Sequence, residues 1–195
     1  MAQAEFDTKS QIANRRCDAL VPSLITDSTS VPQHSGCEIR SEIRIAATRT
    51  DVFPFLVDAE RMKLWLAPIV SVDPRLVGIF RLSNYNGLWI EGLYLEAFAY
   101  QRVAFTWGGI EGLKIGESTV EVSLRPDAAG TVVELRHSGL SEPAFELHHL
   151  GWKEWALPKL KAVAQGGEPT GTFLGDIADA REQFAYRSMG SHPQF

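Results

Sequence analysis

Alternation of hydrophobic and polar positions predicts a series of β-strands through the middle of the chain. Ile39, Ile43 and Ile45 alternate with charged side chains, which is the pattern of a strand with one buried face. The same alternation returns in residues 119–124 and 133–137, which a Pro-Asp-Ala-Ala-Gly turn separates. Apolar runs predict further strands at residues 69–73, 78–83, 88–98 and 101–107. Together these segments predict an antiparallel sheet of about six to seven strands.

Three segments show helical signals instead. Residues 48–58 start with Thr48 or Thr50 as a cap, and Pro54 limits the helix because proline has no N–H to donate. A second short helix is predicted over residues 59–66, and a long one from Glu142 to about residue 165. Pro158 lies inside the long helix, so we expect a kink or a split there. The predicted fold class is α+β, with the long helix covering one face of the sheet.

Composition and charge divide the chain and restrict its partners. The 195 residues, 45% hydrophobic and 22% charged, suit one domain with tails: a disordered leader over residues 1–37, a domain over 38–166, and an extension over 167–195. In the extension, Phe173, Ile177, Ala180 and Phe184 have helical spacing, so this helix is expected to dock on the domain or on a second copy. Residues 191–195 resemble the core of an affinity tag, and we assign them no function.

The net charge of −5 and the lack of a basic stripe argue against a nucleic-acid partner. No apolar run is long enough to span a membrane, and no signal peptide is visible, so we expect a cytoplasmic protein. We expect Cys17 and Cys37 to be free thiols, with a disulfide between them as the alternative.

Five short segments resemble one known family. Residues 47–68, ATRTDVFPFLVDAERMKLWLAP, are similar to the start of START-like (SRPBCC) domains of the heat-shock-chaperone ATPase-activator-homologue branch. Later signatures of that branch follow in the expected order, at residues 73–75, 105–107, 135–140 and 148–152. The chain departs from the pattern at Leu76-Val77-Gly78, where a pair of glycines is common, and at Pro54 and Pro158.

The resemblance implies a helix-grip fold, in which a curved antiparallel sheet wraps around a long C-terminal helix, with two short helices after the first strand. It also implies an apolar cavity between sheet and helix. Members of this superfamily include ligand carriers, aromatic-ring cyclases, hydroxylase-associated domains and chaperone activators. The fold alone therefore assigns no function.

Large aromatic side chains and two histidines are the candidate ligand-binding residues. His148, Trp152 and Trp155 recur at i, i+4 and i+7, so they share one face of the long helix. His137 has the strand parity of Val133 and Leu135, which points it inward. The full set is Phe53, Trp65, Phe80, Trp89, Phe105, Trp107, His137, His148, Trp152 and Trp155. The alternative for each aromatic residue is plain core packing, and for each histidine an ordinary structural hydrogen bond.

The remaining chemistry is sparse. The sequence has no metal-binding motif and no nucleophile elbow, so we expect neither a metal nor a cofactor. The leading hypothesis is non-enzymatic binding of a small aromatic or lipid-like molecule. One alternative is a cyclase or hydrolase that uses His137 or His148 with Glu91 as acid–base groups, although we favour an outward Glu91, turned by a bulge near Gly92. A second alternative is a chaperone ATPase-modulating domain, and a homodimer contact stays open.

Overall fold

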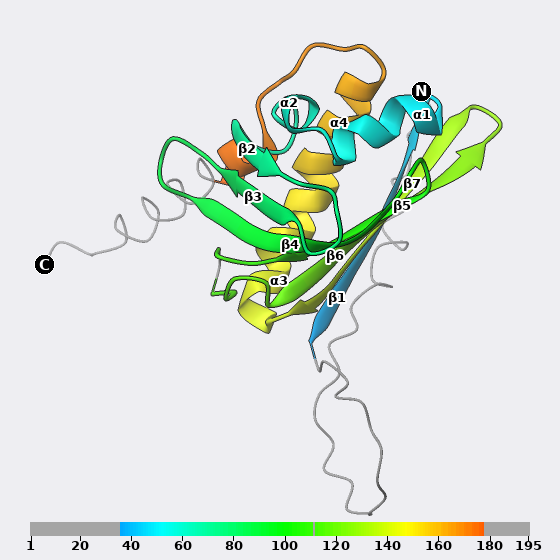
Figure 1. Ribbon diagram of the computed structural model, residues 1–195. Coiled ribbons are helices and arrows are strands. Elements are labelled where there is room, and N and C mark those ends of the chain that lie inside the picture. Colours follow the sequence, from blue (N-terminus) through cyan, green and yellow to red (C-terminus); the bar gives the residue numbers. More distant parts are fainter. Residues whose placement is uncertain (1–35, 111, 178–195) are drawn as a thin grey trace, which may run out of the picture.

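The computed structural model describes residues 36–177, apart from residue 111. The tag-like end and residues 1–35 of the predicted leader lie outside these residues, and Cys37, the last residue of that leader, begins the first strand. In the described part, the strands form one antiparallel sheet in the order β1-β7-β6-β5-β4-β3-β2 (Figure 1). Their bounds are β1 Cys37–Ile45, β2 Ile69–Val72, β3 Ile79–Ser83, β4 Trp89–Phe98, β5 Arg102–Trp107, β6 Ser118–Asp127 and β7 Gly130–Leu140. The predicted strands and the antiparallel sheet are confirmed.

Two short helical stretches connect β1 to β2. The first consists of α1 (Arg49–Val52) and the 3-10 helix η1 (Phe53–Leu56), and the second is α2 (Ala59–Met62). Thr48 caps α1 in a capping box with Asp51, which decides between the two predicted caps. Pro54 stands at the start of η1, where its missing N–H leaves no hydrogen bond unmade.

One long helical segment covers the concave face of the sheet (Figure 1). It consists of α3 (Glu142–Leu150), the π-helix η2 (Gly151–Ala156) and α4 (Leu157–Ala164), which follow one another without a break. The α-helical hydrogen bonding is interrupted directly before Pro158, which stands in the first turn of α4, in line with the expectation that this proline divides the long helix. The ring of a proline crowds the carbonyl four residues earlier, here that of Glu154, and the wider π turn at that point accommodates it.

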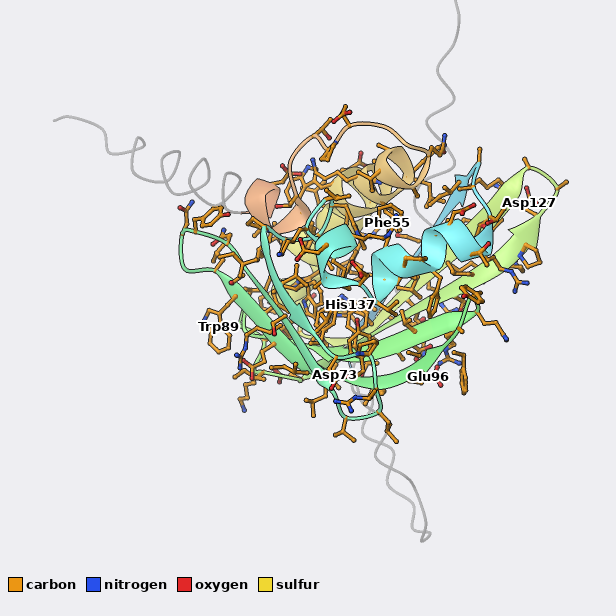
Figure 2. All side chains as sticks on the ribbon, turned by 45° about the horizontal axis from the view of Figure 1, so that its top comes forward. Phe55, Asp73, Trp89, Glu96, Asp127 and His137 are labelled. Carbon is orange, nitrogen blue, oxygen red and sulfur yellow. The ribbon has the colours of Figure 1, made fainter. Side chains whose placement is uncertain are left out.

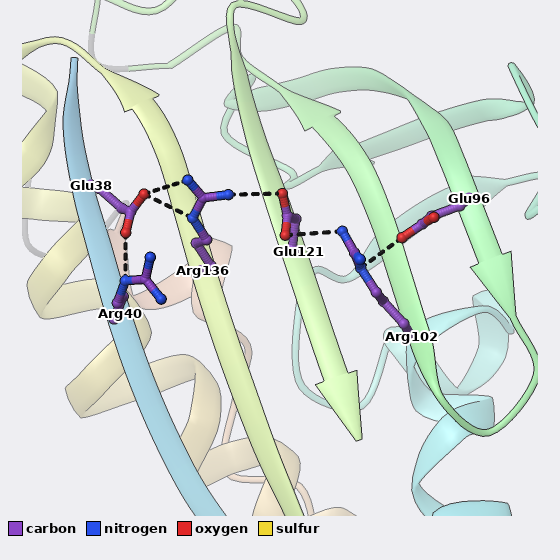
Figure 3. A network of polar contacts seen from close by, with 6 residues as sticks. All are labelled: Glu38, Arg40, Glu96, Arg102, Glu121 and Arg136. Carbon is purple, nitrogen blue, oxygen red and sulfur yellow. Dashed lines mark hydrogen bonds and ion pairs between the residues drawn. The ribbon is translucent and has the colours of Figure 1, made fainter. Parts of the chain in front are cut away.

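The outer face of the sheet carries a ladder of ion pairs across five strands, beside exposed apolar side chains of β4 such as Leu93 (Figure 3). Glu38 binds Arg136 at 2.6 Å, Arg136 binds Glu121 at 3.2 Å, Glu121 binds Arg102 at 3.1 Å, and Arg102 reaches Glu96 at 2.6 Å. Because one face is charged and the other apolar, the sheet has one side for solvent and one for the core.

The structure corrects the expectation for Cys37. This residue is buried at the start of β1 and is disulfide-bonded, so it is not the free thiol that we expected. The chain's other cysteine, Cys17, lies outside the described residues. No helix in residues 36–177 is both long enough and apolar enough to cross a membrane.

Candidate ligand-binding interior

Two buried histidines face each other between the sheet and the covering helix. His137 lies on the inner face of β7 and His148 on α3, and neither has any solvent exposure. Their ring centroids are 5.2 Å apart in an edge-to-face arrangement. Figure 2 shows His137 in the middle of the molecule, enclosed by the sheet and the helices. The sequence prediction of an inward His137 is confirmed by its burial.

A continuous set of hydrogen bonds surrounds the two rings. Trp152 Nε1 donates to His137 Nδ1 at 2.9 Å, and Trp107 Nε1 donates to His148 Nε2 at 3.1 Å. Each indole can only donate, so each histidine nitrogen that it meets must be unprotonated. His148 Nδ1 then donates to the carbonyl of Ala144 at 2.8 Å. His137 Nε2 donates to Ser118 Oγ at 2.8 Å, and that hydroxyl donates to the Trp107 carbonyl at 2.9 Å.

This bonding pattern assigns one neutral tautomer to each histidine, with every ring nitrogen satisfied. Burial lowers the pKa of His148 to about 4, although its hydrogen bond to the Ala144 carbonyl acts in the opposite direction and raises the pKa. Burial also lowers the pKa of His137 well below its ordinary value, and the neighbouring His148 adds to this effect. Both rings are therefore uncharged at neutral pH, and neither has a free nitrogen for a proton transfer. Their arrangement is that of structural hydrogen-bonding groups.

Aromatic rings fill the space around this pair. Phe80 from β3 stacks on Phe105 from β5 with centroids 4.0 Å apart, and Tyr94 meets both rings edge-on. The Tyr94 hydroxyl donates to the Leu56 carbonyl at 3.0 Å, and burial raises its pKa. Trp107 and Trp152 continue the cluster, with centroids 5.2 Å apart. The interior is therefore an aromatic layer with a small, fully paired polar centre.

A segment beyond the long helix completes this layer. Residues 173–177 are helical, and Phe173, Leu174 and Ile177 are completely buried. The Phe173 ring stacks on Trp152 with centroids 5.1 Å apart and planes 10° apart. The predicted helix in the extension thus begins in the described residues and docks on the domain. Ala180 and Phe184, which continue its spacing, lie outside them.

Most of the predicted site residues come together in this interior, and some do not. Trp65, Phe80, Phe105, Trp107, His137, His148 and Trp152 are all buried there. Trp155 is partly buried against the core. Phe53 is buried in η1 and meets Tyr100 edge-on at 5.4 Å.

Trp89 is a correction, because it lies on the outer face of β4 and is 41% exposed (Figure 2). Ile90, Gly92 and Tyr94 occupy the inner positions of this strand, so the alternation turns Trp89 outward. Glu91 is outward as well and pairs with Arg81 at 2.9 Å, across a β3–β4 register that continues without a bulge. Glu91 and the two histidines therefore lie on opposite faces of the sheet, which excludes the acid–base set of the enzyme alternative.

Sequence reasoning missed two members of the interior, Ser118 and Phe173, as site residues. Ser118 has the parity of Val120 and Val122, so alternation contained the signal that it points inward. Helical spacing marked Phe173 as buried, but its stacking partner lies on another helix and no local pattern reveals it. Among residues 36–177 without 111, no cluster of three or more His, Cys, Asp or Glu side chains is arranged to hold a metal ion.

Two surface hollows lined by described residues have volumes of about 500 and 440 Å³. Both lie on the outer face of the sheet beside the ion-pair ladder, where Arg136 lines each of them. Neither is the apolar cavity between sheet and helix that the resemblance implies. In that region the rings of Trp107, Trp152 and Phe173 pack against one another instead.

The curved sheet and its covering helix define a helix-grip protein of the START-like class. The sequence model of the family described as "Activator of Hsp90 ATPase homolog 1-like protein" matches residues 46–165. The chain belongs to this family. A comparison with curated proteins found no match.

Solved structures agree on the fold. An AHSA1-like protein from Rhizobium etli is 29% identical, over 68% of this chain and 84% of that one, with a TM-score of 0.55. CalU16 from Micromonospora echinospora is 23% identical, over 91% and 96% of the two chains, with a TM-score of 0.59. The Aha1 dimer from Colwellia psychrerythraea is 18% identical, over 67% and 97%, with a TM-score of 0.58.

Proposed function

We propose that this chain binds a small hydrophobic molecule, aromatic or lipid-like, between its sheet and its C-terminal helix, and that it does so without catalysis. The observation that carries the proposal is the character of the interior. Its surface consists of aromatic rings, and its polar groups are bonded to one another. Such an interior offers dispersion contacts and stacking to an apolar guest, and no free group for chemistry.

The packing of the interior sets a condition on this function. Because Phe173 is buried and stacked on Trp152, a guest that binds against Trp152 must displace the Phe173 ring. The polar centre is an unsuitable place for this, since opening it would leave buried donors and acceptors unpaired. We therefore expect the guest to displace an apolar side chain that takes part in no hydrogen bond.

A binding screen tests the proposal. Purified full-length chain is measured by native mass spectrometry and by thermal unfolding against a panel of planar aromatic compounds and fatty acids. We expect a one-to-one complex and a raised Tm with at least one aromatic compound. A panel in which nothing binds and nothing shifts the Tm would contradict the proposal.

The other partners and the location that the sequence suggested stay predictions. Modulation of a chaperone ATPase draws on the family description alone, and no described feature of this chain favours it over ligand binding. The dimer from Colwellia psychrerythraea is a property of that protein, and a homodimer of this chain is a separate prediction. A cytoplasmic location is likewise a prediction, and the disulfide at Cys37 argues against it, because disulfides persist mainly in oxidising compartments.

A further inference from the structure

The ring of Phe173 occupies a slot that the rest of the domain builds. Gly151 and Trp152 form one side of this slot, and Trp107 meets the ring from the sheet, with centroids 5.9 Å apart. A Cβ on Gly151 would stand 2.5 Å from Cε2 of Phe173, closer than carbon atoms approach. The missing side chain at position 151 is therefore what makes room for a planar ring against Trp152.

The ring comes from outside the residues that the family model matches. The family match ends at residue 165, whereas Phe173 follows an exposed connector over residues 165–171. Gly166 and Gly171 in that connector have φ of 81° and 92°, and a Cβ on Gly166 would meet nothing within 4 Å. A solvent-exposed connector thus leads to a buried aromatic anchor.

Few polar contacts hold this segment in place. Phe173 and Leu174 donate their backbone N–H groups to the carbonyls of Trp65 and Leu66, at 2.8 and 3.0 Å. Lys159 on α4 binds the Thr170 carbonyl at 2.9 Å and the Asp176 carboxylate at 3.1 Å, and Asn84 Nδ2 donates to the Leu174 carbonyl at 3.3 Å. The hydrogen bonds of His137 and His148 go to Trp152, Ser118, Trp107 and Ala144, so the apolar Phe173 ring can leave without breaking them.

We propose that residues 173–177 are a displaceable strap, and that the slot which Phe173 now fills is the binding site for one planar aromatic ring of a ligand. The inference rests on the proposed hydrophobic binding and names its place. The apparent affinity for the ligand then depends on the fraction of molecules in which the strap has left the slot. A ligand that binds only this minor state has an apparent affinity reduced in proportion to that fraction. Loosening the strap should tighten binding without changing the slot.

Indole, a soluble planar aromatic compound, is the probe for the experiment. Its affinity is measured by calorimetry for the full chain and for the variants Lys159→Ala and Lys161→Ala. Both lysines are on α4, but only Lys159 reaches the strap among the described residues. We expect Lys159→Ala to bind indole about fivefold more tightly than the unmodified chain. Lys161→Ala should match the unmodified chain.

Hydrogen exchange on the unmodified chain gives a second readout. Binding of indole in a preformed cavity would leave the exchange of the strap amides unchanged. Saturating indole should speed exchange of the Phe173 and Leu174 amides, because their acceptors on Trp65 and Leu66 are lost when the strap leaves. A Phe173→Ala variant, with the slot emptied, should bind indole more tightly still. If that variant does not fold, the exchange data and the lysine pair decide the question.

The outcomes separate the strap from the broader function. If an aromatic compound binds the unmodified chain while exchange at Phe173 and Leu174 stays unchanged and the two lysine variants agree, the strap is wrong and hydrophobic binding survives. If a folded Phe173→Ala chain and the unmodified chain both bind neither indole nor any panel compound, the proposed function fails and the strap fails with it.

Discussion

The indole Nε1 of Trp152 donates a 2.9 Å hydrogen bond to Nδ1 of His137, and this bond ties the π-helix η2 to the centre of the sheet. It also fixes His137 in the tautomer that donates to Ser118. One contact therefore sets both the position of the aromatic side chain that Phe173 stacks on and the tautomer of His137.

Replacing Trp152 with phenylalanine should destabilise the fold through this bond. The ring that Phe173 stacks on is largely kept, but His137 Nδ1 is left buried without a donor, which costs about 1–3 kcal/mol. Trp155→Phe is the matched control, since Trp155 is on the same helix, partly buried and outside this hydrogen-bonded set. Urea unfolding of both variants makes the comparison, and equal losses would show that the bond to His137 contributes nothing particular.

Stability should fall as the pH decreases from about 6.5 to 5. Both buried histidines have a lowered pKa in the folded chain, so the unfolded chain binds more protons in this range. Their stabilising effect is complete above the unfolded pKa and is lost as the pH falls toward the folded one. For His148 alone the loss at pH 5 is about 2 kcal/mol, and His137 adds to it in the same direction. Urea unfolding at pH 7.5, 6 and 5 measures this loss of stability. A free energy of unfolding that stays constant over this range would contradict the conclusion that both histidines are buried in the neutral form.

Gly151→Ala should destabilise the chain although alanine is the better helix former. In an ordinary helix this change gains about 1 kcal/mol, whereas here the new methyl group meets the Phe173 ring at 2.5 Å. We expect a net loss of about 1–3 kcal/mol from this overpacking. In a Phe173→Leu background the loss should shrink, and chemical unfolding of the four chains in the cycle reports the coupling. Additive losses would mean that position 151 does not act through the ring.

Val77→Gly should stabilise the fold by about 0.5–1 kcal/mol. Val77 has a φ of 61°, a left-handed conformation that costs a β-branched residue energy, and its side chain is 65% exposed, so little packing is lost. The neighbouring Leu76 is also exposed, but its φ is not positive, so Leu76→Gly relieves no strain and should be destabilising. Thermal unfolding of the two variants makes the comparison. A Val77→Gly chain with a lower Tm than the parent would contradict the claim that the backbone at Val77 is strained.

The ion-pair ladder on the outer face should matter little for either stability or binding. Glu121 bridges Arg136 and Arg102, yet the two arginine side chains are each 42% exposed (Figure 3). Exposed pairs of this kind contribute about 1 kcal/mol or less. Glu121→Gln should therefore lower the free energy of unfolding by less than about 1 kcal/mol and leave indole affinity unchanged. A large loss of affinity would instead place the binding site at the outer hollow of about 500 Å³, which Glu121 lines.

Local patterns predicted much of this architecture because alternation and caps are local signals. The strands, the cap at Thr48 and the inward His137 all follow from residues within a few positions of one another. Trp89 was misassigned because a wide aromatic side chain suggests burial, whereas it alternates with the inward Ile90 and Tyr94 and therefore points outward. The bonds from Trp107 to His148 and from Trp152 to His137 were beyond prediction, since each joins strand and helix across the whole interior. The sequence located the interruption of the long helix at Pro158, but it did not show that the interruption takes the form of a π turn.

A crystal structure of the full chain grown with saturating indole tests the central claim most directly. We predict an indole ring stacked on Trp152 beside Gly151, with Phe173 out of the slot and the bonds of His137 and His148 intact. A structure in which Phe173 keeps its place and no ligand lies between the sheet and the long helix would contradict the account.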